Sequence, residues 1–362
     1  MADPKTKPRK KRVSGLGQIK KKELIPFTRQ TASMLNAGMS ILVAVSTLEE
    51  QCAHAGFKDV LKNLRESIES GLPVSEGLSA FPQIFDEMYI NMVAAGEKSG
   101  QFANVLKRLA LMLDASARLL RKVKSALTYP IVVLSLALII AGGLITFVVP
   151  VFTEMFSGFG HSLPRMTQML VDASNFVRDR WYIIIVVVVV AVFGFRKWKA
   201  TPAGRLAFDR FILKLPVFGQ LIQKVAIARF CRLLAQMLTS GVPILDAMGI
   251  VARSIGNKIM EGSILAARSE VEQGNNLSSA LEGKPFLPIL MNRMIAAGEK
   301  SGRIDEMLES VADTYDDEVE TTLATLTALM EPFLMVFLGV IIGSIVIAMF
   351  LPIFKLGTVV GG

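Results

Sequence analysis

Three uncharged runs set the strongest limit on how this chain can fold. Residues 125–153, 181–195 and 332–354 contain no Asp, Glu, Lys or Arg. In a bilayer every backbone N–H and C=O group must find its partner within the protein, so apolar runs of this kind have to be helical. About 20 residues are enough to cross the hydrocarbon layer of about 30 Å. The first and third runs meet this length, which predicts an integral membrane protein.

The second run is short for a crossing, but its flanks favour one. Its 15 residues span about 22 Å at about 1.5 Å per residue. Arg180 on one side and Arg196 on the other can extend outward to the two surfaces. Trp181 and Trp198 suit the two interfaces. We therefore predict three transmembrane helices.

Basic residues orient these helices. Residues 107–124 and 196–214 carry six Lys or Arg each, whereas residues 154–180 carry three basic and three acidic groups. By the positive-inside rule the first two stretches are cytoplasmic and the third lies across the membrane. The basic start has no apolar core of the kind found in a secretory signal peptide, so the amino end is expected in the cytoplasm.

The excess positive charge is concentrated at the amino end. The chain has a formal charge of +9, and residues 1–22 alone hold nine basic groups and one acid. A segment with so few apolar residues is predicted to be disordered. Its expected ligand is anionic lipid at the membrane surface, and the charge gives no reason to expect nucleic acid.

The chain contains an internal repeat of about 202 residues. Residues 27–44 read FTRQTASMLNAGMSILVA and residues 230–247 read FCRLLAQMLTSGVPILDA, with nine of eighteen positions identical. Residues 92–100 (MVAAGEKSG) and 294–302 (MIAAGEKSG) agree at eight of nine positions. Self-similarity of this kind indicates that one structural unit occurs twice. We expect each copy to consist of a cytoplasmic block followed by a membrane helix.

The two blocks have the hydrophobic pattern of helices. Leu106, Leu109, Ala110 and Leu113 follow the i, i+3, i+4, i+7 spacing. About six helices fit each block, so the predicted fold is an all-α membrane protein with two cytoplasmic helical bundles and three transmembrane helices. The expected order is a basic tail (1–22), the first block (23–124), transmembrane helix one (125–153), a periplasmic segment (154–180), transmembrane helix two (181–195), the second block (196–331), transmembrane helix three (332–354) and a periplasmic end (355–362).

The motif GEKSG occurs once in each repeat, at residues 96–100 and 298–302. A phosphate-binding loop is excluded, because Glu separates Gly from Lys and no strand is expected before the motif. One interpretation is a tight turn between two helices. The other is that Glu97 and Glu299 contact a partner protein or a weakly bound divalent cation, although two carboxylates alone specify no metal.

Residues 305–320 hold eight acids and no base, whereas the matching stretch of the first repeat carries Lys107, Arg108 and Arg118. The acids either form a solvated face or dock a basic surface, which is the first block, a second subunit or the tail. Charge reversal at Asp316 and Asp317 distinguishes these interpretations. Only the docking interpretation predicts that the complex with the basic partner becomes weaker.

Small residues recur four apart in two of the apolar runs. Gly339 and Gly343 form a GxxxG motif, and the equivalent positions in the first run are Ala137 and Ala141. Such pairs allow helices to approach closely in a membrane. Specific helix association and incidental composition are both consistent with them.

The sequence offers no arrangement typical of an active site. Its two histidines, His54 and His161, are predicted on opposite sides of the membrane, and Cys52 and Cys231 form no CxxC motif. The apolar runs also lack the ionisable groups that transporters of ions usually need. We expect neither an enzyme nor a cofactor.

Several segments together resemble the type II secretion F-domain family. They are FTRQTASMLNAG and FCRLLAQMLTSG, the twice-used AAGEKSG, LTYP before the first apolar run, KLPVFGQLIQK, and EPFLMVFLGVIIGSIVIAMFLPIF. The resemblance extends from about residue 24 to the end, and the closing LPIFKLGTVVG is more similar to the type IV pilus branch than to the secretion branch. It implies that both blocks are F domains, with the family's paired motifs on Gly96, Glu97, Gly100, Gly298, Glu299 and Gly302.

The resemblance implies a non-enzymatic platform protein of the bacterial inner membrane that assembles as a homo-oligomer. Such a protein would couple a cytoplasmic hexameric ATPase to the extraction of pilin subunits and the assembly of a filament. Its expected partners are the assembly or retraction ATPase, pilin or pseudopilin subunits and other inner-membrane components. Two alternatives stay open: a platform protein of a type II secretion system, and a passive membrane scaffold that recruits cytoplasmic partners without moving anything.

Overall fold

A computed structural model describes residues 23–151 and 165–360 of the chain. All regular structure within these ranges is helical, which confirms the predicted all-α class. The basic tail predicted at residues 1–22 lies outside the described residues. The same holds for residues 152–164, which include His161 and the first part of the predicted periplasmic segment at residues 154–180, and for residues 361–362.

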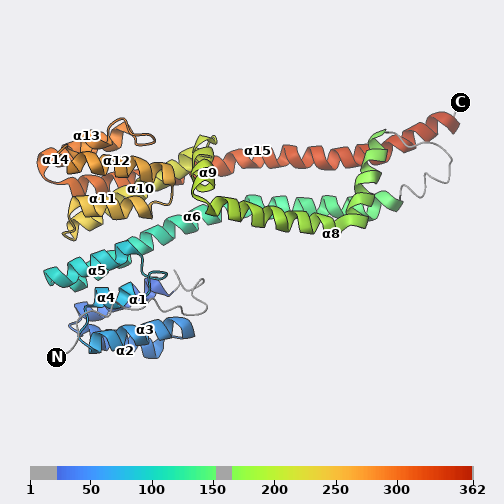
Figure 1. Cartoon of the computed structure of the whole chain (residues 1–362). Coiled ribbons are helices and arrows are strands. Elements are labelled where there is room, and N and C mark those ends of the chain that lie inside the picture. The colour runs from blue at the N-terminus through green and yellow to red at the C-terminus, as the bar shows by residue number, and fades with distance from the viewer. Residues whose placement is uncertain (1–22, 152–164, 361–362) are drawn as a thin grey trace. The chain divides into compact units, whose positions relative to one another are not determined.

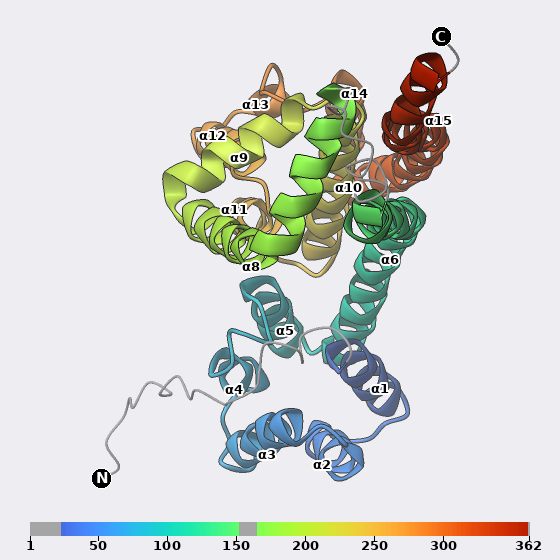
Figure 2. The same ribbon diagram turned by 90° about the vertical axis from the view of Figure 1, so that its right-hand side faces the viewer.

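The first repeat forms five helices and the start of a long sixth one, and in Figure 2 α1 and α5 lie next to the start of α6 while α2, α3 and α4 complete the bundle (compare Figure 1). Short polar side chains begin some of these helices: Asp86, for example, accepts a hydrogen bond from the amide of Tyr89 over 2.9 Å. The helices are α1 (Leu24–Asn36), α2 (Ile41–Gln51), α3 (Ala55–Glu69), α4 (Val74–Ser79), α5 (Glu87–Ser99) and α6 (Phe102–Gly143).

The second repeat forms the same series of helices. The pairs α2 and α11, α3 and α12, and α5 and α14 have equal lengths of 11, 15 and 13 residues. The predicted duplication of the sequence is therefore also a duplication of structure. The helices are α10 (Phe218–Thr239), α11 (Ile244–Ser254), α12 (Lys258–Glu272), α13 (Leu277–Leu281), α14 (Ile289–Ser301) and α15 (Ile304–Val360).

The described residues of the two repeats together form one compact unit, residues 23–121 and 212–319. In the first repeat the buried hydroxyls of Thr28 and Tyr89 lie 3.0 Å apart. The corresponding positions of the second repeat are Cys231 and Met291, both buried. Burial raises the pKa of the Tyr89 phenol well above its usual value. The two cores therefore share a packing plan, but one uses a polar pair where the other uses two sulfur-containing side chains.

The second compact unit consists, among the described residues, of residues 122–151, 165–211 and 320–360. It contains the last part of α6, a π-helical turn (Leu144–Val148), α8 (Arg165–Ala200), most of α9 (Pro202–Lys214) and the last part of α15. α8 bends at Arg180, whose φ of −125° and ψ of 23° are not helical. After this bend α8 runs roughly parallel to the last parts of α6 and α15 (Figure 1).

Among the described residues, two helical stretches are long and apolar enough to cross a membrane, Phe102–Val151 and Ile304–Leu351. A further candidate is the pair of α9 and α10, which is bent by 109°. α10, however, buries Phe230 and Leu234 in the core of the second repeat, so its apolar face already has a partner. α6 and α15 both run without a break through the boundaries predicted after residues 124 and 331.

Candidate functional site

The GEKSG motif joins two helices in each repeat. α5 ends at Ser99, Gly100 has φ 70° and ψ 6°, and α6 begins at Phe102. In the second repeat Gly302 has φ 72°, and α15 begins at Ile304. Residues with a side chain rarely adopt this left-handed conformation, so glycine ends the helix here. The motif thus sets the direction in which each long helix leaves its domain.

The first glycine of the motif lies where two helices approach closely. A Cβ atom on Gly96 would lie 3.0 Å from Cβ and Cγ2 of Val105 in α6. A Cβ atom on Gly298 would lie 2.9 Å from Cα of Ile304 and 3.0 Å from Cγ of Met307 in α15. These distances are too short for ordinary carbon contacts. Any side chain here would therefore push α5 away from α6, or α14 away from α15.

The glutamate of the motif caps a neighbouring helix. Glu97 accepts hydrogen bonds from the amide of Val74 over 2.5 Å, from the amide of Ser75 over 3.1 Å and from the Ser75 hydroxyl over 2.5 Å. These amides begin α4, whose first N–H groups have no partner within the helix. A carboxylate at this end also suits the positive end of the helix dipole.

Glu299 makes the equivalent contacts in the second repeat. Its carboxylate accepts hydrogen bonds from the amide of Leu277 over 2.5 Å and from the amide of Ser278 over 3.2 Å, and it also bonds the Ser278 hydroxyl. The Gly-Glu-Lys-Ser-Gly spacing therefore combines three tasks: close helix contact, capping of a short helix and a left-handed stop.

The structure places Glu97 and Glu299 at two separate helix N-termini. Within residues 23–151 and 165–360, no group of three or more His, Cys, Asp or Glu side chains is arranged to hold a metal ion. Binding of a divalent cation by the two glutamates therefore stays a prediction. The described residues do not group further His, Cys, Asp or Glu ligands for such a cation.

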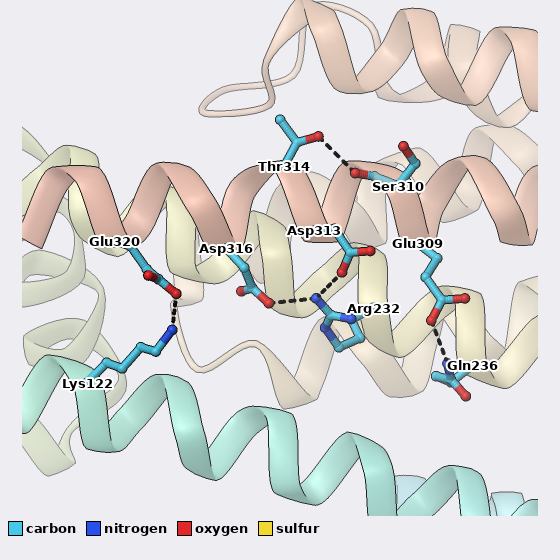
Figure 3. Close-up of polar contacts among 9 residues, drawn as sticks. All are labelled: Lys122, Arg232, Gln236, Glu309, Ser310, Asp313, Thr314, Asp316 and Glu320. Carbon is cyan, nitrogen blue, oxygen red and sulfur yellow. Dashed lines mark hydrogen bonds and ion pairs between the residues drawn. The ribbon is translucent and has the colours of Figure 1, made fainter.

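An ion pair joins the first helix of each repeat to its last helix. Arg232 in α10 donates to Asp316 over 2.6 Å and to Asp313 over 2.9 Å, as Figure 3 shows. In the first repeat Arg29 in α1 donates to Asp114 in α6 over 2.5 Å. Each arginine lies two positions after the phenylalanine with which its copy of the repeated motif begins. This shared position in the two copies is the sequence signal that could have identified the arginines.

The environment of Arg232 favours its charged form. Burial disfavours the charge, but hydrogen bonds and Coulombic attraction from Asp313 and Asp316 outweigh it, so the pKa of Arg232 is raised. Only 18% of this side chain is exposed. Loss of either aspartate would therefore leave a largely buried cation with less compensation.

Other acids of the predicted acidic stretch also contact basic or polar side chains. Glu318 lies 2.9 Å from Lys224 of α10, and Glu309 accepts a hydrogen bond from Gln236 of α10 over 3.4 Å. Glu320 is paired with Lys122 of α6 (Figure 3). Much of the acidic face thus lies against α10 of the same repeat, a contact that neither sequence interpretation named, whereas Lys122 belongs to the first block that the docking interpretation did name.

The two pairs of small membrane residues have different surroundings. Ala137 and Ala141 of α6 are buried, with 7% and 6% of their surface exposed. Gly339 and Gly343 of α15 have open space where a Cβ atom would lie. Since each residue of a helix is turned by about 100° from the one before, Gly339 and Gly343 lie on the side of α15 opposite to the buried Leu334.

Comparison with known proteins assigns the fold to a family. The family model described as type II secretion system protein F matches residues 27–150 and again residues 230–352, which together are more than half of the chain. A type IV pilus assembly protein PilC of Myxococcus xanthus is 39% identical over 344 residues, covering 95% of this chain and 82% of that protein. The PilC protein of Thermus thermophilus is 41% identical over 92% of this chain and 82% of its own length. The type II secretion system protein F of Vibrio cholerae is 32% identical, again over 92% of this chain and 82% of its own length. With both repeats matched by the same model, the chain belongs to the type II secretion system protein F family.

Proposed function

We propose that this inner-membrane protein is the platform of a type IV pilus assembly machine and couples a cytoplasmic hexameric ATPase to the extraction of pilin subunits. The observation that carries this proposal is the continuity of α6 and α15, each of which begins in an F domain and extends into an apolar stretch. An unbroken helix passes on a rotation or shift of the domain in which it is anchored. The duplicated ion pairs and glycine contacts provide that anchorage.

The proposed topology has both F domains and the amino end in the cytoplasm and three membrane crossings. The second crossing is the part of α8 after Arg180, and its apolar side chains are exposed on all sides, as expected for a helix in contact with lipid. The aliphatic and phenylalanine side chains in this part that are 48% to 70% exposed are Ile185, Val186, Val187, Val188, Val189, Val190, Val192, Phe193 and Phe195. A reporter fused after Lys199 should give a cytoplasmic signal, and a periplasmic signal would contradict the crossing.

We propose that the motif residues act on partners indirectly, through the shape of each F domain. The carboxylates of Glu97 and Glu299 are occupied by helix N-termini, so a partner that bound them directly would have to displace these hydrogen bonds. Asp316 and Asp317 stay candidates for a docking surface, with Arg232 as the competitor for Asp316. Charge reversal at both aspartates should weaken co-purification of the ATPase if they contribute to docking.

We also propose that the chain forms a homo-oligomer through α15. Gly339 and Gly343 leave open space on a side of the helix that no described residue of the chain covers. Replacing Gly343 with Leu should reduce crosslinking between copies in membranes. Gly142→Leu in α6, where a Cβ atom would also meet open space, is the matched control.

The pilus branch is favoured because relatives named for type IV pilus assembly share more identity with this chain than those named for type II secretion. Deleting the gene for this chain should abolish surface filaments while pilin and ATPase levels stay normal. Intact filaments combined with loss of a secreted protein would instead support the secretion alternative.

Insertions that break the continuity of α15 distinguish the coupling function from that of a passive scaffold. Four Gly or Ser residues inserted after Thr327 should abolish filament assembly but leave ATPase recruitment intact. Seven helix-forming residues at the same place, which restore the phase of the helix after about two turns, should be better tolerated. A scaffold that moves nothing would support filaments with either insertion.

A further inference from the structure

The part of α8 that precedes its bend lies across the membrane helices. In Figure 1 this part crosses from α15 towards α6, whereas α8 after Arg180 runs roughly parallel to both. The sequence alone assigned these residues to a connecting periplasmic segment. A helix at a steep angle to neighbouring membrane spans is instead oriented near the plane of the membrane.

Two hydrogen bonds hold this transverse helix, residues 165–179, against the spans. Thr167 Oγ1 donates to the carbonyl oxygen of Ala348 in α15, and Ser174 Oγ donates to that of Ile145 in the π-helical turn, each over 2.6 Å. Thr167, Ser174 and Val171 between them are buried. One side of the transverse helix is thus fixed on two spans at once.

The remaining surface of the transverse helix has an apolar side and a polar side. At 100° per residue the apolar side chains occupy about a third of the circumference, the width typical of an amphipathic helix. Met166 is 64%, Met169 74% and Phe176 48% exposed. The apolar side consists of Met166, Met169, Leu170, Ala173, Phe176 and Val177, and the polar side of Gln168, Asp172, Asn175 and Asp179.

The apolar side continues the surface by which the spans face lipid. Next to the contact at Ala348, Ile347 and Phe350 are 57% and 52% exposed, and near Ile145 Phe147 is 74% exposed. Ala348 lies six residues, or about 9 Å, before Phe354, the last uncharged residue of its span. Amphipathic helices that rest on membranes insert to about 5–10 Å, so the depth agrees.

We propose that residues 165–179 form an amphipathic helix embedded in the outer leaflet, parallel to the membrane plane, with lipid acyl chains covering its apolar side. This position explains the short second span. Residues 181–195 cover about 22 Å, and they begin at the depth of the transverse helix. The transverse helix itself lies about 9 Å below the outer end of the hydrocarbon layer. This depth and the length of residues 181–195 together equal the hydrocarbon thickness of about 30 Å.

Spin labels on the full chain in lipid nanodiscs test this placement. Cys52 and Cys231 are first replaced with Ala, and single cysteines then replace Met169, Ala173 or Phe176 on the apolar side and Gln168, Asp172 or Asn175 on the polar side. Oxygen partitions into lipid, whereas a nickel chelate stays in water. We expect the ratio of oxygen to nickel accessibility to oscillate along the helix with a period of about 3.6 residues. Its maxima should fall at 169, 173 and 176.

Two control positions set the scale: Val188 for lipid and Glu50 for water. A label at position 169 should give a ratio well above the one at 50 but below the one at 188, which lies deeper in the bilayer, and a label at position 172 should match the one at 50. High nickel accessibility at all six positions would place the helix in water and overturn the proposal. Protection of the apolar side from both reagents would also overturn it, because a protein and not lipid would then cover that side.

Discussion

Arg232 donates a hydrogen bond to Asp316 over 2.6 Å, and the first F domain contains the same pair between Arg29 and Asp114. In both domains the pair joins the first helix to the long helix that continues towards the membrane. The two pairs differ in exposure, since 18% of the Arg232 side chain and 60% of the Arg29 side chain face solvent. Solvent screening should therefore make the first pair the weaker one.

Replacing Asp316 with Asn should lower the free energy of unfolding by about 1–3 kcal/mol, because Arg232 loses part of its compensation. Asp114→Asn should cost less, since its partner is mostly exposed. Thermal unfolding of the purified protein in detergent would measure both. A double-mutant cycle with Arg232→Gln isolates the pair, and Glu50→Gln serves as a surface control. A coupling energy near zero in the cycle would contradict this role.

Replacing Glu97 or Glu299 with Gln should destabilise the corresponding F domain by about 1–2 kcal/mol, because the charged acceptor at the start of α4 or α13 is lost. The measurement is again thermal unfolding, combined with hydrogen exchange of the amides of Val74 and Leu277. Lys98→Gln changes the next residue, whose side chain is exposed, and should have little effect. Equal effects at 97 and 98 would show that the cap is unimportant.

Gly96→Ala and Gly298→Ala should each cost about 1–3 kcal/mol of stability, because the added methyl group meets atoms about 3 Å away. Gly262→Ala, in the middle of α12 with open space around it, should instead stabilise the protein by up to about 1 kcal/mol. Chemical unfolding of the three variants compares these opposite signs. If all three behaved alike, the close helix contact would not be what selects glycine.

The thiol of Cys231 should react with iodoacetamide far more slowly than that of Cys52. Cys231 is fully buried, and burial raises the pKa of its thiol, so little reactive thiolate forms at pH 8. Cys52 is only partly buried. Mass spectrometry of tryptic peptides during labelling gives the two rates. In denaturant the rates should become similar, and similar rates in the native protein would refute the buried environment.

Alkaline pH should destabilise the second F domain through Tyr315. Burial, followed by the charge of Glu318, raises the pKa of this phenol to about 12. The pKa of an unfolded tyrosine is about 10, so the contribution of Tyr315 to stability is complete below pH 10. It is lost as the pH rises from about 10 to 12, because the unfolded chain releases the proton first. Unfolding temperatures measured over this range should fall less steeply for Tyr315→Phe than for the native chain.

The sequence predicted the helical class and the duplication because both leave local signals. Apolar spacing and uncharged runs report on secondary structure directly, and the repeated motifs can be aligned by eye. The left-handed stop at Gly100 and Gly302 also follows from local chemistry, since a glycine after a helical pattern is a common end signal.

The contacts of the motif were not predictable because they join distant parts of the chain. Glu97 is 23 residues from Val74, and Arg232 is 84 residues from Asp316. Which carboxylate meets which donor depends on how the helices pack, and hydrophobic periodicity does not encode this. For the same reason the acidic stretch at residues 305–320 could be recognised as unusual but not matched with α10.

The short helices of both domains have a consequence for the order of folding. α4 has six residues and α13 five, far below the roughly 12–15 at which an isolated helix is marginal in water. Their capping carboxylates lie 23 and 22 residues further along the chain. During synthesis these segments therefore stay unstructured until the ribosome has delivered Glu97 or Glu299, and a nascent chain is open to proteases there until then.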